Sequence, residues 1–112
     1  MGKIVDLKTV VFYEDPEGRK PFTEWLEGLR DRKGRERIMA RISRLTQGNY
    51  GDCESVGEGV SELRMFFGPG YRAYIGEAGN HIVVLLCGGD KSTQPQDIKT
   101  AQAYWKEHQS HE

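Results

Sequence analysis

The residues best suited to chemistry are two arginines that break the pattern of their apolar neighbours. Arg64 follows Leu63, and Arg72 follows Tyr71. Successive side chains of a strand point to opposite faces, so both arginines and Tyr74 share one face if a turn pairs the two strands. An arginine fork binds phosphate through two hydrogen bonds and keeps its charge at any physiological pH. The pattern therefore favours an anion-binding site on a sheet.

A polar segment follows the most apolar run of the chain, residues 82–87. It reads Gly88-Gly89-Asp90-Lys91-Ser92-Thr93-Gln94, and its two glycines permit close backbone approach or a positive φ. It lacks the GxxxxGK[ST] spacing of a phosphate-binding loop. Two interpretations stay open: a site at the end of the sheet, or a turn in which Asp90 caps the start of a helix.

These groups suit cleavage of RNA without a metal, in which the 2′-hydroxyl attacks the adjacent phosphate. Arg64 and Arg72 would stabilise the dianionic phosphorane. Lys91 would donate or accept a proton, and Asp90 would orient Lys91. On this hypothesis, replacing Arg72 by alanine abolishes activity and leaves the fold intact.

An aromatic ring beside a cation can stack an unpaired base, and Tyr71 or Tyr74 would supply that ring. The plain alternative is that the two arginines are ordinary surface charges paired with Glu62 or Glu54. The side chains expected to contact the substrate are Tyr71, Tyr74, Asp90, Ser92 and Gln94.

The sequence lacks the residue patterns of metal sites and of the common hydrolase and redox motifs. His81, His108 and His111 do not have metal-ligand spacing, and the acidic residues do not cluster as a two-metal nuclease requires. The motifs GxSxG, HExxH and CxxC are absent. Cys53 lies in a polar segment and Cys87 ends an apolar run, so we expect no disulfide between them. We expect neither a metal nor another cofactor.

The length of 112 residues fits one domain, residues 1–112. No apolar run approaches the roughly 20 residues of a membrane span, and the first residues show no apolar export signal. We therefore expect a cytoplasmic protein with no membrane partner. The net charge of −1 hides a segregation, because residues 30–44 hold seven basic and two acidic residues. This basic block is either a solvated helix face or a surface for an acidic partner.

The elements expected to position these groups follow the order β-α-α-β-β-β-α. A strand is expected at residues 9–14. Pro21 then opens a helix with apolar residues at i, i+3, i+4 and i+7. A second helix follows an interruption at Gly34, and the two helices form a hairpin. Residues 50–59 read as a polar connection.

Turn-rich residues 67–70 and 77–80 join the next three strands into an antiparallel meander. The last of these, residues 82–87, is apolar throughout and is expected to be central and covered on both faces. A helix is expected in the tail from Gln96. The predicted fold class is α+β, with one sheet and one helical layer.

Three segments together resemble the RelE/ParE superfamily of bacterial type II toxin–antitoxin systems: FTEWLEGLRDRKGRERIMARISRLTQGNYGD, GEGVSELRMFFGPGYRAY and VVLLCGGDKSTQPQDIKTA. Within it, the chain is similar to the phage-derived, HigB-like "addiction module killer protein" group. The resemblance implies a RelE-like fold, a small twisted, mainly antiparallel sheet with a helical hairpin on one face and a concave cationic site on the other.

The resemblance also implies a ribosome-dependent mRNA endoribonuclease that inhibits translation. The family's sheet arginines match Arg64 and Arg72, and its C-terminal site residue corresponds most nearly to Lys91. Implied partners are the ribosome, mRNA and a cognate antitoxin, commonly a small helix-turn-helix protein through which DNA is bound only indirectly.

The chain departs from the family near its C-terminus. Many RNA-cleaving members carry a further tyrosine or histidine there, whereas this chain has Asp97 and no histidine until His108. Two alternatives therefore remain: a ParE-like DNA gyrase inhibitor that acts by binding, and a non-toxic phage-derived interaction module.

Overall fold

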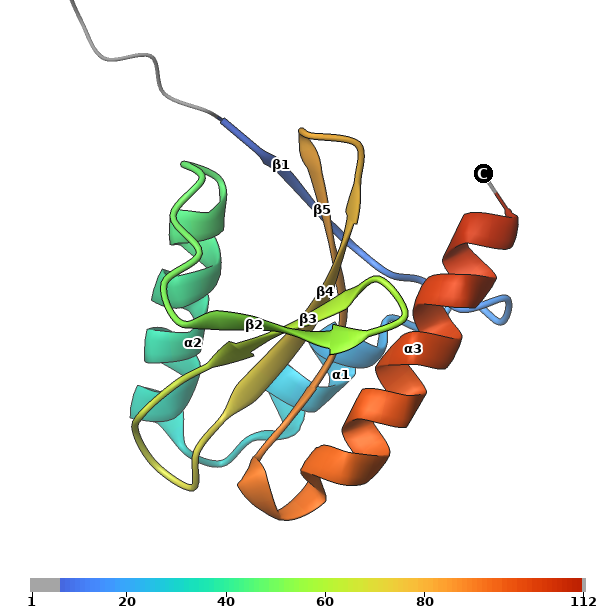
Figure 1. Cartoon of the computed structure of the whole chain (residues 1–112). Coiled ribbons are helices and arrows are strands. Elements are labelled where there is room, and N and C mark those ends of the chain that lie inside the picture. Colours follow the sequence, from blue (N-terminus) through green and yellow to red (C-terminus); the bar gives the residue numbers. More distant parts are fainter. Residues whose placement is uncertain (1–6, 112) are drawn as a thin grey trace, which may run out of the picture.

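The structure, a computed structural model, describes residues 7–111 of the chain. Most of the segment searched for an export signal, residues 1–8, lies outside this range. The elements run in the order β1-α1-α2-β2-β3-β4-β5-η1-α3 (Figure 1). Their bounds are β1 Thr9–Phe12, α1 Pro21–Gly28, α2 Arg32–Leu45, β2 Cys53–Gly57, β3 Val60–Arg64, β4 Arg72–Ala78, β5 Ile82–Gly89, the 3₁₀ helix η1 Lys91–Thr93 and α3 Gln94–Ser110.

The strands form one mixed sheet in the order β1-β5-β4-β3-β2. β1 lies parallel to β5, and all other neighbours are antiparallel. The predicted meander is confirmed as β3-β4-β5. β5 is internal, and its residues from Val83 to Cys87 are buried, as expected of a strand covered on both faces. The fold is α+β.

The polar connection predicted for residues 50–59 is wrong, because it contains β2. The sequence CESVG has no alternating apolar pattern, and pairing with β3 supplies its backbone hydrogen bonds instead. β2 lies at the edge of the sheet, where a polar strand stays partly exposed. The register shifts between Ser55 and Gly57, as at a β-bulge, and pairing with β3 resumes at Gly57 and Val60.

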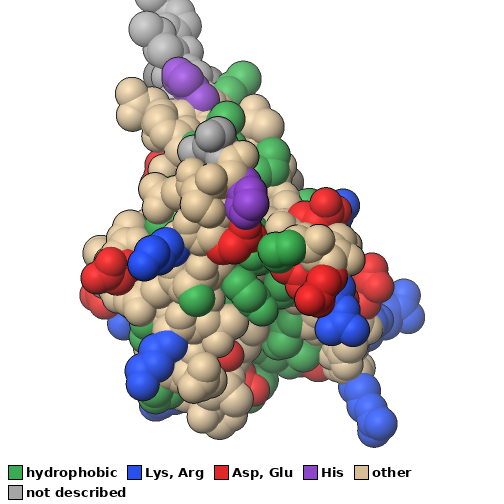
Figure 2. Space-filling view, turned by 90° about the vertical axis from the view of Figure 1, so that its right-hand side faces the viewer, with side chains coloured by type: hydrophobic (Ala, Val, Ile, Leu, Met, Phe, Trp, Pro, Cys, Tyr) green, Lys and Arg blue, Asp and Glu red, His purple; other side chains and the backbone are tan. Residues whose placement is uncertain are grey.

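Helices cover both faces of the sheet, so the prediction of a single helical layer is also wrong. α1 and α2 pack on one face, and α3 crosses β3, β4 and β5 on the other (Figure 1). Figure 2 shows the α3 side, where Lys and Arg side chains lie toward the margins and are interspersed with acidic ones. α3 therefore covers the middle of the face for which the resemblance implies a cationic site.

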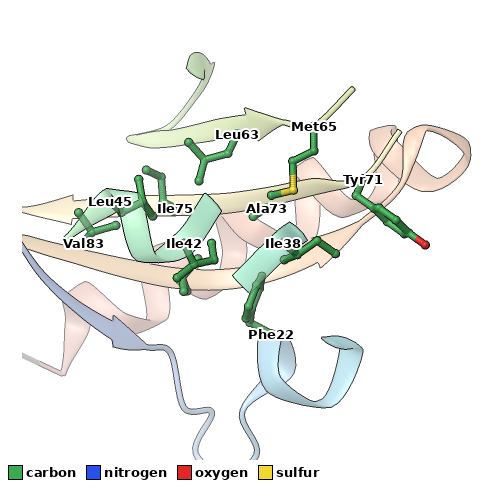
Figure 3. Packing of buried hydrophobic residues seen from close by; sticks show 11 residues of the cluster. Phe22, Ile38, Ile42, Leu45, Leu63, Met65, Tyr71, Ala73, Ile75 and Val83 are labelled. Atoms are coloured by element: carbon green, nitrogen blue, oxygen red, sulfur yellow. The ribbon is translucent and has the colours of Figure 1, made fainter. Parts of the chain in front are cut away.

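The helical hairpin is held by apolar side chains that recur on one face of each helix. Phe22 of α1 and Ile38, Ile42 and Leu45 of α2 are buried against the sheet (Figure 3). Full burial of such a side chain stabilises the fold by about 1.5–3 kcal/mol.

α2 begins at Arg32, so the interruption predicted at Gly34 is wrong. Asp31 caps the helix by accepting a hydrogen bond from the backbone N–H of Gly34 at 2.9 Å. A Cβ at position 34 would lie 2.4 Å from Oδ2 of Asp31 and 2.9 Å from the ring of Tyr71. The glycine is a packing requirement within the helix.

The helix predicted in the tail is confirmed as α3, which begins at Gln94 and carries buried Ala101 and Trp105. The indole of Trp105 lies on Gly76 of β4, where a Cβ would be 2.4 Å from the ring. The apolar core between α3 and the sheet therefore requires glycine at position 76, because a side chain there would collide with the indole. No helix within residues 7–111 combines the length and apolar composition needed to cross a bilayer.

Candidate functional site

Arg64 and Arg72 are direct register partners across β3 and β4, and Glu62 pairs with Tyr74 two positions further along. Alternation along the strands places all four side chains on the face of the sheet that α3 covers. The predicted placement of both arginines and Tyr74 on one face is therefore confirmed. Their surroundings differ.

Arg72 is part of a buried ion pair. Its Nε lies 3.4 Å from Oε2 of Glu62, and the two side chains are only 13% and 2% exposed. Nη1 of Arg72 donates to the carbonyl oxygen of Gly70 at 2.9 Å. The Nε–H itself is buried and lacks hydrogen-bond geometry to an acceptor among the described residues. The guanidinium is thus held in place mainly by charge.

The same carboxylate oxygen of Glu62 accepts two hydrogen bonds, from the hydroxyl of Tyr74 at 3.0 Å and from Nε2 of Gln94 at 2.9 Å. Tyr74 is fully buried, and burial followed by the Glu62 charge raises the pKa of its hydroxyl. The prediction that Tyr74 stacks a base is therefore wrong, whereas substrate binding by the half-buried Gln94 stays a prediction. Both side chains complete the cluster that fixes Arg72.

Arg64 lies nearer the surface. Its Nη2 is 3.1 Å from Oδ1 of Asp52 and 2.9 Å from Oε1 of Glu54, and its side chain is 29% exposed. The hydrogen bond that the guanidinium donates to Asp52 is the largest cause that raises its pKa. Both arginines are therefore paired with carboxylates, as the plain alternative predicted for Glu62 and Glu54, although Arg72 is not a surface charge.

The two glycines after the apolar run allow close approach of side chains from within the protein. A Cβ at Gly88 would lie 2.3 Å from the ring of Trp25, and a Cβ at Gly89 would collide with the carboxylate of Asp97. The close approach predicted here is confirmed, and its partners belong to the chain itself.

Asp90 caps the 3₁₀ helix that follows β5 by accepting a hydrogen bond from the backbone N–H of Ser92 at 2.8 Å. The hydroxyl of Ser92 also donates to this carboxylate. Both bonds use Oδ1 of Asp90, and no ion pair with Lys91 is present within residues 7–111, so the orienting role of Asp90 stays a prediction. Lys91 is exposed, and no described residue forms an ion pair or hydrogen bond with its ammonium.

Tyr71 lies on the opposite face from the arginines. Its ring is 4% exposed within the core of α1 and α2, and its hydroxyl donates to Oδ2 of Asp31 at 2.9 Å. Figure 3 shows the ring at the end of this core with the hydroxyl pointing away from it. Tyr71 therefore joins the β3–β4 loop to the start of α2, and the prediction that it stacks a base is wrong.

A pocket of about 340 Å³ nevertheless brings the three predicted catalytic residues together. Its lining includes Arg64, Arg72 and Lys91, and the β3–β4 loop adds Phe66 and Phe67. We call it the arginine–lysine pocket. Sequence reasoning did not include the two phenylalanines in the site; both follow the end of β3 at Arg64. The signal was the turn Gly68-Pro69-Gly70, which places the preceding residues in a loop.

A second pocket of about 470 Å³ adjoins the first and shares the wall from Arg64 to Phe67. Its other side is α2, which contributes Arg37, Arg41 and Arg44. Arg41 donates to the carbonyl oxygens of Tyr50, Asp52 and Arg64 at 2.8–3.3 Å and so ties α2 to the edge of the sheet. We call this second pocket the α2 groove.

None of the histidines and cysteines of the described residues is part of the lining of either pocket. His81 is in the β4–β5 turn, and His108 and His111 are at the end of α3. Cys53 and Cys87 are not bonded to each other, and burial raises the pKa of the Cys87 thiol to about 12. Within residues 7–111, no three His, Cys, Asp or Glu side chains are grouped to hold a metal ion.

Comparison with known proteins gives one informative relative. No family model and no solved structure matches the chain. An uncharacterized protein of Haemophilus influenzae is 50% identical over 80 residues, which cover 71% of this chain and 81% of the relative. This identity and coverage show that the chain belongs to the same protein family as that uncharacterized Haemophilus influenzae protein.

Proposed function

We propose that the chain is the toxin of a type II toxin–antitoxin module, a HigB-like member of the RelE/ParE superfamily that cuts mRNA on the ribosome without a metal. The observation that carries the proposal is the arginine–lysine pocket, where Arg64, Arg72 and Lys91 converge from two strands and the segment after β5. The helical hairpin on one face of a largely antiparallel sheet is consistent with a RelE-like fold.

In this mechanism the 2′-oxygen forms a bond to phosphorus and the 5′-oxygen leaves, which gives a 2′,3′-cyclic phosphate. Arg64 and Arg72 stabilise the charge that develops on the non-bridging oxygens. The ammonium of Lys91 donates a proton to the leaving oxygen. When the phosphate binds Arg64, it replaces Asp52 or Glu54 as the partner of the guanidinium. The released carboxylate then accepts the proton of the 2′-hydroxyl.

The proposal includes a cognate antitoxin and action in the cytoplasm. Exposed arginines of α2 and acidic side chains such as Glu54 on β2 offer an antitoxin two surfaces of opposite charge near the pockets. A small helix-turn-helix antitoxin that wraps this end of the molecule would cover the arginine–lysine pocket. Contact with DNA would then occur only through that partner.

Inhibition of DNA gyrase by binding is the second candidate, and the pairing of the arginines favours it. Arg64 and Arg72 are both neutralised by carboxylates, and no histidine of the described residues lines the pocket. A site of this kind can bind without transferring a proton. A non-toxic phage-derived interaction module is the third alternative.

The proposal is tested by translation of a defined message with purified ribosomes, followed by mapping of RNA ends. We expect cleavage by the wild-type chain and at least a tenfold slower rate for Arg64→Ala and Lys91→Ala. Exposed Arg32 and Lys99 supply matched controls as Arg32→Ala and Lys99→Ala, which should cleave normally. An uncut message together with inhibited supercoiling by purified gyrase would assign the second function. The third alternative, a non-toxic interaction module, would be supported if the message stays uncut, gyrase stays active and induction does not affect growth.

A further inference from the structure

We propose that Phe66, Phe67, Arg37 and Arg44 form a subsite, the base-stacking subsite, that holds an unpaired base of single-stranded RNA beside the phosphate at Arg64. The inference rests on the proposed function, because it names the substrate contacts of the same site. It adds residues from α2 and from the β3–β4 loop that the predicted catalytic set did not include.

Phe66 is the most exposed large apolar side chain of the described residues, at 83%. It lines both the arginine–lysine pocket and the α2 groove. Its neighbour Met65 is buried, and the backbone N–H of Met65 donates to the carbonyl oxygen of Tyr71 at 3.0 Å. The loop is therefore anchored in the core while the Phe66 ring faces solvent.

The loop conformation depends on two glycines with positive φ, Gly68 at 58° and Gly70 at 78°. Residues with a Cβ rarely adopt this conformation, so the turn is fixed by sequence. The ring of Phe67 packs edge-on against Tyr71 with centroids 5.8 Å apart. This ordered turn leaves the Phe66 ring uncovered and suited to stacking. The entropy cost of binding a base is small when the surface that it meets is already ordered.

Arg37 supplies the cation above this turn. Its guanidinium lies 5.0 Å from the centroid of the Phe67 ring, a cation–π contact between α2 and the β3–β4 loop. Such a planar cation can itself stack on a base or bind a phosphate.

The basic side chains of α2 form a stripe. Arg37, Arg41 and Arg44 recur at i, i+4 and i+7, so they share one face of the helix and span about 10 Å. Arg41 is occupied by backbone carbonyls. Arg37 and Arg44 are exposed, and within residues 7–111 no carboxylate forms an ion pair with either.

Cations that track a backbone, next to an aromatic ring that accepts a base, are the pattern of single-strand binding. A duplex keeps its bases stacked on one another and would leave the Phe66 ring uncovered. The groove that runs from Arg44 through Phe66 to Lys91 therefore favours an unpaired strand over a double helix.

The test measures equilibrium binding of a 2′-O-methyl hexauridylate and a 2′-O-methyl hexaadenylate to the purified full chain. These probes cannot be cut, so binding is separated from cleavage. We expect Phe66→Ala to weaken binding about tenfold and Phe66→Tyr to retain it. Exposed Met39, on another face of α2, supplies the control Met39→Ala, which should bind as the wild type does. Arg44→Ala should weaken binding of both probes and reduce its salt dependence.

Equal affinities of the wild type and Phe66→Ala would overturn the inference, as would absence of binding by the wild type. Tighter binding of decaglutamate than of either RNA probe, with the same dependence on Phe66, would also overturn it and assign the surface to an acidic protein partner. The two proposals can fail separately. Normal ribosome-dependent cleavage by Phe66→Ala would contradict the base-stacking subsite and leave the nuclease proposal standing. Probe binding that depends on Phe66, without any cleavage of message, would contradict the nuclease proposal and leave the subsite standing.

Discussion

Arg64 and Arg72 face each other across β3 and β4, yet they belong to two different regions of the molecule. Arg72 enters a buried polar cluster beneath α3, in which Glu62 accepts from Tyr74 and Gln94. Arg64 opens toward the α2 groove, and its carboxylate partners are more exposed. Two arginines in similar sequence contexts therefore differ in their surroundings. Arg72 is held by buried partners, whereas Arg64 is the more accessible charge.

The first prediction removes each arginine in turn. Arg72→Ala leaves the Glu62 carboxylate buried without its cation, which should lower the free energy of unfolding by about 3 kcal/mol or more. Arg64→Ala should leave stability almost unchanged, because its partners stay hydrated. Urea denaturation followed by circular dichroism measures both.

The earlier expectation that Arg72→Ala leaves the fold intact is therefore replaced by this prediction. Combining Arg72→Ala with Glu62→Gln should restore part of the loss, since the uncompensated charge is then removed. Equal urea midpoints for Arg72→Ala and the wild type would contradict the distinction between the two regions.

The second prediction tests the hydroxyl groups. Tyr74→Phe removes a buried hydrogen bond to Glu62 and should lower the free energy of unfolding by about 1–3 kcal/mol. Tyr71→Phe removes a bond to Asp31, which is exposed, and should have a smaller effect. The same urea experiment ranks the two variants by their free energy of unfolding. A larger loss for Tyr71→Phe would contradict the greater contribution of the cluster beneath α3.

The third prediction concerns alkaline pH. Burial, followed by the Glu62 charge, raises the pKa of Tyr74 in the folded state above its ordinary value of 10.0. The unfolded chain therefore loses this proton first, so the stabilisation is complete below pH 10 and declines above it, by about 1.4 kcal/mol per pH unit. Urea midpoints between pH 9 and 11 should fall less steeply for Tyr74→Phe than for the wild type. Parallel slopes would contradict the buried position of this phenol.

The fourth and smallest prediction concerns the carboxylates on and beside β2. Asp52→Asn combined with Glu54→Gln removes the groups that occupy Arg64, so affinity for the 2′-O-methyl probes should rise a few-fold at low salt. Glu36→Gln removes an exposed carboxylate paired with Arg32 and should change nothing. Unchanged affinity in the double variant would show that Arg64 does not compete for the anion.

The sequence predicted most of the architecture and the shared face of the two arginines. Helical spacing after Pro21 located α1, and the apolar run of residues 82–87 located the internal strand β5. β2 was missed because a polar edge strand has no apolar alternation, and its hydrogen bonds with β3 depend on residues far along the chain.

The roles of the tyrosines and of the segment after β5 were less predictable. Alternation gives the face on which Tyr74 lies, whereas its burial depends on α3 covering that face, which is a tertiary effect. Phe66 lies in the β3–β4 loop because β3 ends at Arg64, an end that the sequence pattern did not mark. Lys91 lines the arginine–lysine pocket because it follows the internal strand β5, whose position the apolar run indicated.

The central claim is that single-stranded RNA lies along the α2 groove and the arginine–lysine pocket. Titration of isotope-labelled full-length chain with 2′-O-methyl hexauridylate, followed by two-dimensional NMR, tests it residue by residue. The largest shift changes should fall on residues 64–68, on Arg37 and Arg44, and on Lys91. Changes concentrated on Met39 and the outer side of α1, or no changes at probe concentrations that saturate binding, would contradict the claim.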